Sequence, residues 1–280
     1  MTDPVLDLRA GLAAAPQPRT AVLVVDDGTE IAYHRWEPDP GVRAHPVPVV
    51  LQHGFTANTM VDWAGSGTVT ALTAAGRTVV GVDARGHGQS QKSPDPRRYG
   101  EPRMAMDLRA VIDLLGVHEV DLVGYSMGSI ISLLVVAEEP KVRKLVVGGV
   151  GAGVVEVGGV DTRVLPSDVL ADALLADDLG SLPPEVAGMR TFAQTVGADL
   201  PSLAAQARAV HTRGVDLARI TARTLVIAGD EDPLAARPEV LADAIPDARL
   251  VLVAGDHTIV GSSPDFRTAV VDFLQNESSA

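Results

Sequence analysis

The sequence contains no cysteine among its 280 residues. This absence excludes disulfide bonds, a thiolate nucleophile and any metal site with cysteine ligands. No apolar run reaches the length of about 20 residues that a helix needs to span a bilayer. The first 20 residues lack a basic start followed by a continuous apolar segment, so we expect no signal peptide and a cytoplasmic protein.

Basic residues are few, with 23 Lys and Arg against 36 Asp and Glu, and the formal net charge is -13. Such an acidic surface repels nucleic acid and anionic membranes, and we expect neither as a partner. The seven histidines are scattered and show no ligand spacing on a helix, so we expect no metal and no other cofactor. Aromatic residues make up only 3% of the chain.

Short apolar segments alternate with helical patterns along most of the chain. Continuously apolar strands that alternate with helices indicate a mostly parallel sheet covered by helices on both faces, an α/β fold. A β-hairpin is predicted over residues 21–36, with its turn at Asp27-Gly28. Further strands are predicted at 47–52, 78–82, 120–123, 144–147, 224–228 and 250–253, and helices at 104–115, 129–138, 238–244 and 264–275.

The stretch from about residue 151 to 219 breaks this alternation. It offers helical patterns at 167–178, 185–195 and 203–212 and no clear strand. We therefore expect residues 1–150 and 220–280 to form one core domain, with 151–219 inserted as a helical cap over its ligand end. Residues 1–18 contain three prolines and are expected to form a loosely attached N-terminal arm with one short helix.

Residues 124–128 read Gly-Tyr-Ser-Met-Gly. A predicted strand precedes them, and an apolar segment long enough for a buried helix follows. Gly-x-Ser-x-Gly between a strand and a helix is typical of a nucleophile elbow, a tight turn that exposes the serine hydroxyl. The pattern alone arises by chance in roughly one chain of this length in ten, so its weight comes from the flanking elements. Ser126 is the candidate nucleophile.

A serine hydroxyl needs a general base, and the base needs an acid that orients it. His257 follows the last predicted strand, and parallel sheets place ligand-facing residues in the loops after their strands. His257 is therefore the candidate base.

The orienting acid is expected in the loop after the preceding strand, which carries three acids, whereas the loop at 148–153 carries none. Asp232 is favoured over Asp230, which is better placed to close the turn after the strand, and over Glu231, which is expected to face solvent. Asp256 adjoins His257 and is poorly placed to reach its Nδ1 atom.

Several segments, in this order and spacing, resemble the α/β-hydrolases of the small cap-bearing esterase, lipase and haloperoxidase-like type. They are residues 51–55 (Leu-Gln-His-Gly-Phe), 82–90 (Val-Asp-Ala-Arg-Gly-His-Gly-Gln-Ser), the elbow, and the loops at 229–232 and 255–257. The resemblance covers roughly residues 20–150 and 220–280. It implies that the backbone N–H groups of Phe55 and Met127 form an oxyanion hole. His53 and residues 83–90 are assigned to bracing the loops behind it.

Departures from the family pattern narrow the chemistry. A serine at the elbow, where some members have aspartate, disfavours alkyl-enzyme chemistry, and the lack of tyrosine within 151–219 disfavours epoxide hydrolysis. Thr56 and Ser129 stand where cofactor-free haloperoxidases and perhydrolases often have proline and glycine. The resemblance therefore implies a serine carboxylesterase. Thioesterase, acyltransferase, carbon–carbon hydrolase or lyase, perhydrolase and receptor-like binding roles remain alternatives.

The expected substrate is a neutral small-molecule ester with a small to medium, mostly apolar acyl group. Met189 and Phe192 are candidate substrate contacts, although side chains at this helical spacing are more often part of a cap core. Trp63 is assigned either to the pocket wall or to helix packing. Nothing in the sequence specifies an oligomeric state.

Overall fold

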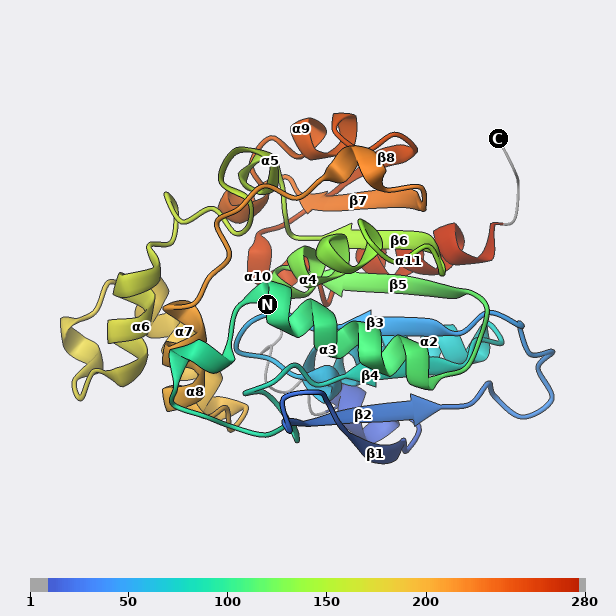
Figure 1. Cartoon of the computed structure of the whole chain (residues 1–280), viewed down its shortest axis with the longest axis horizontal. Coiled ribbons are helices and arrows are strands. Elements are labelled where there is room, and N and C mark those ends of the chain that lie inside the picture. The colour runs from blue at the N-terminus through green and yellow to red at the C-terminus, as the bar shows by residue number, and fades with distance from the viewer. Residues whose placement is uncertain (1–9, 277–280) are drawn as a thin grey trace.

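The computed structural model describes residues 10–276 of the chain. Its centre is an eight-stranded sheet in the order β1-β2-β4-β3-β5-β6-β7-β8 (Figure 1). The strands are β1 (Arg19–Val24), β2 (Glu30–Trp36), β3 (Val49–Gln52), β4 (Val79–Val82), β5 (Val120–Tyr125), β6 (Val142–Gly148), β7 (Arg223–Gly229) and β8 (Ala248–Val253).

The sheet is parallel from β4 to β8, while β1 and β2 join it as an antiparallel hairpin. All residues of β3, β4 and β5 are buried, which is the pattern of strands covered on both faces. The predicted α/β class and the predicted strands are thereby confirmed. The strand order places β3 beside β5, so that the loops after these two strands meet at one edge of the sheet.

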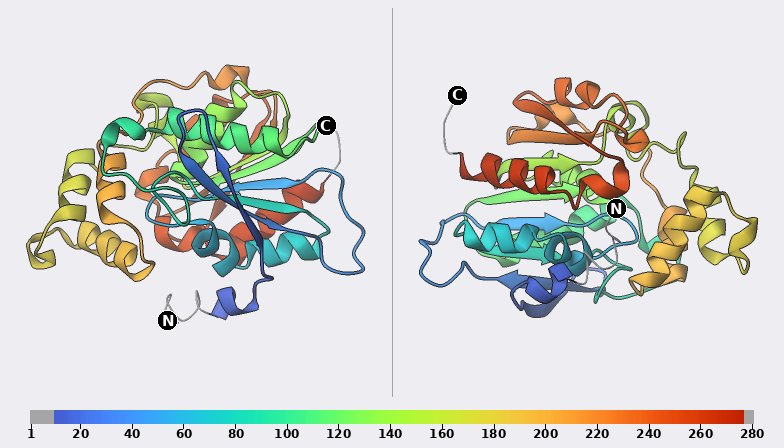
Figure 2. Two further views of the ribbon diagram at one scale, coloured as in Figure 1. Left: turned by 60° about the horizontal axis from the view of Figure 1, so that its bottom comes forward. Right: turned by 180° about the vertical axis from the view of Figure 1, so that it is seen from behind.

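Helices cover both faces of the sheet. Figures 1 and 2 show α3 and α4 on one face and α2 and α11 on the other. Successive strand residues alternate between two apolar clusters, so that Val50 packs towards α3 and α4 while Val49 and Leu51 pack towards α2 and α11. The covering helices are α2 (Thr68–Ala74), α3 (Glu101–Leu114), α4 (Met127–Val136), α9 (Pro238–Asp243) and α11 (Pro264–Gln275).

The segment after β6 forms α5 (Ala152–Val157), α6 (Ser167–Leu175), α7 (Pro184–Thr195) and α8 (Leu200–Ala207). Helices α6, α7 and α8 lie beyond the carboxyl ends of the parallel strands (Figure 1). They share an apolar cluster of their own, which includes Leu170, Leu174 and Leu203. The side chain of Phe55, from the loop after β3, packs against both this cluster and the core cluster beside α3 and α4.

Several short helical segments form where the sequence analysis predicted none. A π-helical turn, η1 (Met60–Gly65), and α2 follow the loop after β3. Helix α5 forms in the Gly- and Val-rich stretch after β6. The expectation of a loop at His257 is wrong, since His257 is the first residue of α10 (His257–Val260). The side chain of Asp256 accepts hydrogen bonds from the N–H groups of Thr258 and Ile259, and this cap begins the helix.

The predicted N-terminal arm falls partly outside the described residues, which begin at residue 10. Residues 10–14 are helical. Ala15 is buried, and the indole N–H of Trp36 donates a hydrogen bond to the Pro16 carbonyl oxygen at 2.7 Å. These contacts fix the end of the arm to β2 more firmly than its prolines suggested. Among residues 10–276, no helix combines the length and the apolar character that crossing a membrane requires.

Candidate active site

Ser126 lies at the sharp turn between β5 and α4. Its φ of 52° and ψ of -120° place a non-glycine residue in a strained backbone conformation. Such strain costs on the order of 1–3 kcal/mol and persists only where surrounding contacts enforce it. Here the Ser126 N–H donates to the Gly148 carbonyl oxygen at 2.8 Å, and the Ser126 carbonyl oxygen accepts from the Ser129 N–H at 2.8 Å. This strained strand-to-helix turn has the backbone geometry that a nucleophile elbow requires.

Both glycines of the elbow are required by close backbone contacts. A Cβ atom added to Gly124 would lie 2.4 Å from the Gly128 carbonyl oxygen. A Cβ atom added to Gly128 would lie 2.1 Å from the carbonyl oxygen of Gln52, at the end of β3. The second contact brings the elbow against the loop that follows β3.

The side chains of Ser126, His257 and Asp232 form a continuous hydrogen-bonded chain. His257 Nε2 lies 2.9 Å from Ser126 Oγ, and His257 Nδ1 lies 2.8 Å from Asp232 Oδ2. Because a carboxylate only accepts hydrogen bonds, the Nδ1 atom carries the proton, and Nε2 is then free to accept from the serine hydroxyl. The structure therefore brings together three side chains that the sequence distributes over 131 positions.

The acid in this chain is held rigidly. The Asp232 side chain is fully buried, while His257 remains 21% exposed. Asp232 Oδ1 accepts hydrogen bonds from the N–H groups of Leu234 at 2.9 Å and Ala235 at 3.2 Å, which leaves Oδ2 directed at the imidazole. The neighbouring acidic residues have other surroundings. Asp230 Oδ1 accepts from the Gly255 N–H at 2.9 Å, Glu231 is exposed, and Asp256 caps α10.

The two N–H groups expected to form an oxyanion hole each belong to a residue next to one with a positive φ, Phe55 beside Thr56 and Met127 beside Ser126. Met127 is the first residue of α4, so its N–H has no intrahelical partner. Phe55 precedes Thr56, whose φ is 65° and whose hydroxyl donates to the Phe55 carbonyl oxygen at 2.6 Å. Within residues 10–276, neither the Phe55 N–H nor the Met127 N–H donates to an acceptor. Both remain available to an added ligand.

His53 orients the peptide unit that carries the Phe55 N–H. Its Nε2 atom accepts from the Ala84 N–H at 3.0 Å, so Nδ1 carries the proton and donates to the Gly54 carbonyl oxygen at 2.8 Å. A peptide unit is planar, and its C=O and N–H groups point in opposite directions. Holding the Gly54 C=O therefore fixes the direction of the Phe55 N–H. This contact agrees with the bracing role expected for His53.

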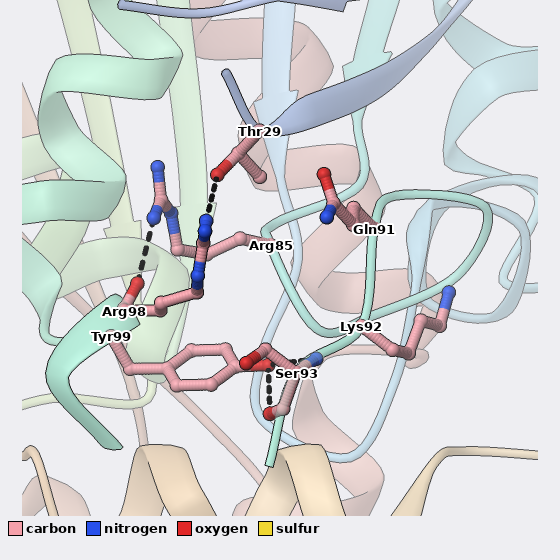
Figure 3. A pocket seen from close by; sticks show the side chains of 7 residues that line it. All are labelled: Thr29, Arg85, Gln91, Lys92, Ser93, Arg98 and Tyr99. Atoms are coloured by element: carbon pink, nitrogen blue, oxygen red, sulfur yellow. Dashed lines mark hydrogen bonds between the residues drawn. The ribbon is translucent and has the colours of Figure 1, made fainter. Parts of the chain in front are cut away.

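The loop after β4 is braced by a buried guanidinium (Figure 3). Arg85 donates to both carboxylate oxygens of Asp107 at 2.6 and 2.7 Å, to Asp27 at 3.0 Å, and to the Arg98 carbonyl oxygen at 2.7 Å. These bonds join the β1–β2 turn, the loop after β4 and α3. The cavity beside them measures about 10 Å³, which is room for roughly one water molecule. It is a structural junction and not a substrate site.

The three predicted substrate contacts lie in different surroundings. Trp63 is fully buried in the cluster beside α2 and α11, with its ring 6.5 Å from that of Phe266. This environment is the one expected if Trp63 takes part in helix packing. Met189 is partly buried against the cluster of α6–α8, and Phe192 on the same helix is 40% exposed.

Two residues that the sequence did not single out also adjoin the site. The Tyr125 hydroxyl donates to the His257 carbonyl oxygen at 2.7 Å, and burial raises the pKa of Tyr125 well above its ordinary value, so the hydroxyl keeps its proton. Gln206 of α8 is buried, and its side-chain amide contacts the Met127 sulfur. Tyr125 stands inside the elbow motif, but no local pattern indicates how far its hydroxyl reaches. Among the described residues, no group of three or more His, Asp or Glu side chains is arranged to hold a metal ion.

Comparison with known proteins agrees with the fold described above. Residues 47–213 match the sequence model of a family described as "alpha/beta hydrolase fold". A protein of Bacillus subtilis (strain 168) whose assigned name is a 2-succinyl-6-hydroxy-2,4-cyclohexadiene-1-carboxylate synthase is 30% identical over 161 residues, which are 57% of this chain and 55% of that protein. The 2-hydroxy-6-oxo-2,4-heptadienoate hydrolase of Pseudomonas putida is 35% identical over 116 residues, 41% of each chain. The chain thus spans about half the length of these curated relatives, or less.

Solved structures match over more of the chain. A hydrolase from Pseudomonas aeruginosa PA01 aligns with a TM-score of 0.70 and 27% identity, covering 92% of this chain and 99% of that one. The enol-lactonase from Burkholderia xenovorans LB400 aligns with a TM-score of 0.68 and 25% identity, covering 91% of this chain and all of that one. Hydrolases are therefore found among both kinds of relative.

Proposed function

Because the chain belongs to the alpha/beta hydrolase fold family, we propose that it is a serine hydrolase that cleaves carboxylic esters through an acyl-enzyme intermediate. Supporting this proposal is the hydrogen-bonded chain from Asp232 through His257 to Ser126, with distances of 2.8 and 2.9 Å. That single arrangement supplies a nucleophile, a base in the correct tautomer and a buried acid that holds it.

In the acylation step, Ser126 Oγ attacks the ester carbonyl carbon while its proton passes to His257 Nε2. The imidazolium that forms is stabilised by the Asp232 carboxylate, which stays ionised. The carbon–oxygen bond to the alcohol then breaks, and His257 returns the proton to the leaving oxygen. In the second half, His257 takes a proton from water, the resulting hydroxide adds to the acyl carbon, and Ser126 leaves with the proton. The products are a carboxylic acid and an alcohol.

The charge that develops on the carbonyl oxygen would be stabilised by the N–H groups of Phe55 and Met127. Met127 also lies at the N-terminus of α4, where the helix dipole favours negative charge. Removing one such donor typically costs about 2.7–4 kcal/mol of transition-state stabilisation. The two groups are free of other partners among the described residues, which supports this role.

The same proposal treats residues 151–219 as a cap that closes over the acyl group. Their apolar side chains are mainly aliphatic, which suits a small to medium, mostly apolar acyl chain. Met189 and Phe192 of α7 remain candidate contacts for that chain. Trp63 is not retained, because its ring is fully enclosed by the core.

A second candidate function is hydrolysis of a carbon–carbon bond. The relative from Pseudomonas putida is named as a hydrolase of 2-hydroxy-6-oxo-2,4-heptadienoate, a substrate in which such a bond is broken, and it shares 35% identity over the matched segment. A serine at the elbow is compatible with this chemistry. Measuring turnover of simple esters and, separately, of a 2-hydroxy-6-oxo-dienoate by the protein distinguishes the two candidates.

The primary test is turnover of p-nitrophenyl acetate and butyrate by the wild-type protein, Ser126→Ala and a matched control, Ser132→Ala. Ser132 is buried in α4, where its hydroxyl donates to the Gly128 carbonyl oxygen. We expect Ser126→Ala to abolish turnover and labelling by a fluorophosphonate, and Ser132→Ala to retain both. Wild-type activity in Ser126→Ala would refute the proposal.

A further inference from the structure

The carboxylate of Asp62 is bonded directly to the loop that carries one of the proposed oxyanion donors. Asp62 Oδ2 accepts a hydrogen bond from the Gly54 N–H at 2.7 Å. Gly54 immediately precedes Phe55. Neither the motifs nor the family resemblance assigned any role to Asp62.

Asp62 is held in place by its own helical turn. It belongs to the π-helical turn η1, and its N–H donates to the Asn58 carbonyl oxygen at 3.0 Å. The Asn58 side chain accepts from the Val61 N–H at 3.0 Å, and the next residue, Trp63, is fully buried. The carboxylate is thus presented to Gly54 by a rigid support, and π-helical turns are frequently found at functional sites.

Asp62 and the nucleophile approach Gly54 together. A Cβ atom added to Gly54 would lie 3.5 Å from Asp62 Oδ2 and 3.5 Å from the Cβ atom of Ser126. Burial raises the pKa of the Asp62 carboxyl above its ordinary value, while His53 and His257 act in the opposite direction. The Asp62 residue is half-buried, and its carboxyl group therefore lies at the site itself.

Gly54 is the residue of this loop that rotates most freely, because it has no Cβ atom. Two hydrogen bonds remove that freedom. His53 Nδ1 holds the Gly54 C=O, and Asp62 holds the Gly54 N–H. With the peptide units on both sides of Gly54 fixed, the Phe55 N–H keeps one direction before substrate binds.

We propose that Asp62 is a positioning residue of the oxyanion hole, which aligns the Phe55 N–H with the developing oxyanion by holding the Gly54 N–H. This inference rests on the proposed function. A donor that is aligned in advance acts mainly on the transition state, so its loss lowers kcat more than it raises KM. If the bond served only the fold, its loss would lower stability without lowering kcat more than it raises KM.

The test compares Asp62→Asn and Asp62→Leu, which have nearly the same shape as aspartate. Only the asparagine keeps an oxygen that can accept from the Gly54 N–H. With p-nitrophenyl butyrate, we expect Asp62→Leu to lower kcat about 10- to 100-fold, the scale of a misplaced catalytic group, with KM changed by less than about 3-fold. Asp62→Asn should stay within about 3-fold of the wild-type kcat, because the acceptor is restored.

The control is Asp95→Ala, which removes an aspartate that accepts from the Arg97 N–H at 3.1 Å on the exposed η2 turn (Pro96–Arg98). It should keep wild-type kcat and KM. Circular dichroism establishes that each variant is folded. If Asp62→Leu does not fold, Asp62→Ala takes its place. If neither apolar variant folds while Asp62→Asn does, Asp62 is a structural residue and the inference is overturned.

The inference is also overturned if Asp62→Leu keeps the wild-type kcat, if only KM changes, or if Asp62→Asn loses as much as Asp62→Leu. The wild-type measurement distinguishes a failure of the role proposed for Asp62 from a failure of the proposed function. A wild-type protein that neither hydrolyses the ester nor reacts with a fluorophosphonate refutes the proposed function, and the role of Asp62 falls with it. An active wild type with unaffected Asp62 variants refutes the role of Asp62 alone.

Discussion

The hydroxyl of Tyr125 and the carbonyl oxygen of His257 are joined by a 2.7 Å hydrogen bond across 132 positions of the sequence. The two rings also lie 5.4 Å apart, and the Tyr125 ring meets Phe266 at nearly a right angle. Tyr125 directly precedes Ser126. One residue therefore links the backbone at the proposed nucleophile to the backbone at the proposed base.

Replacing Tyr125 by phenylalanine should lower both stability and activity. The loss of one buried hydrogen bond costs about 1 kcal/mol of unfolding free energy, and the unpaired His257 carbonyl lets the imidazole shift, which should lower kcat/KM about 10-fold. Urea unfolding and ester hydrolysis measure the two effects.

The matched control is Tyr99→Phe. Tyr99 is as buried as Tyr125, and its hydroxyl donates to the Ser93 carbonyl oxygen at 2.8 Å and accepts from the Ser93 N–H at 3.0 Å, away from His257. It should show a comparable loss of stability with unchanged kcat/KM. Equal loss of activity in both variants would mean that the Tyr125 bond does not position His257.

Replacing Asp232 by asparagine should lower kcat about 10³- to 10⁴-fold with little change in fold. The asparagine oxygen can still cap the turn at Leu234 and Ala235, but its NH₂ group then faces His257 Nδ1 and favours the tautomer that cannot accept a proton from Ser126. Asp230→Asn, in the same loop, should keep wild-type activity. A large loss of kcat in Asp230→Asn with little loss in Asp232→Asn would identify Asp230 as the acid.

Replacing Gly128 by alanine should destabilise the protein at the upper end of about 1–3 kcal/mol, because the new Cβ atom would meet the Gln52 carbonyl oxygen, which belongs to the backbone and cannot move aside cheaply. Gly188→Ala is the control. Nothing lies within 4 Å of a Cβ atom there, and the position is within α7. It should raise stability by about 0.5–1 kcal/mol. Thermal unfolding of both variants distinguishes crowding from a general effect of added methyl groups.

Stability should fall below pH 6.5 in a way that depends on His87. Its imidazole is buried, Nδ1 lies 3.0 Å from the Arg85 carbonyl oxygen, and Nε2 has no partner among the described residues. Burial lowers the pKa of His87 from 6.5 to about 3, with His53 and Lys92 acting in the same direction and Asp83 and the bond to Arg85 opposing them.

Because the pKa of His87 is lower in the folded state, the unfolded chain binds a proton between pH 6.5 and 3 that the native protein does not. The stabilisation is complete above pH 6.5 and is lost as the pH falls towards 3. From pH 7 to 5 this group should account for about 2 kcal/mol of lost unfolding free energy. Urea unfolding of the wild type and His87→Asn should show a smaller pH dependence in the variant, and equal slopes would contradict the assignment.

The sequence by itself determined the parts that local patterns encode. Apolar runs of four to seven residues located the strands, since a strand buried on both faces must be apolar throughout. The elbow located Ser126 between a strand and a helix, and the position after the last strand singled out His257. Asp232 followed because the competing loop at 148–153 contains no acid. The strands, Ser126 and His257 were located from residues within one element and the turn beside it, and Asp232 from a comparison of two such turns.

The tertiary structure alone decided the relations between distant elements. The pairing of β3 with β5 brings Asp62, Gly54 and Ser126 together, and no local pattern specifies that pairing. Trp63 packs towards Phe266 because α2 and α11 cover the same face of the sheet. The reach of Tyr125 to His257 likewise depends on strand order. Local propensity fixes elements, whereas such contacts arise only when the whole sheet has packed, because each depends on surfaces supplied by several segments at once.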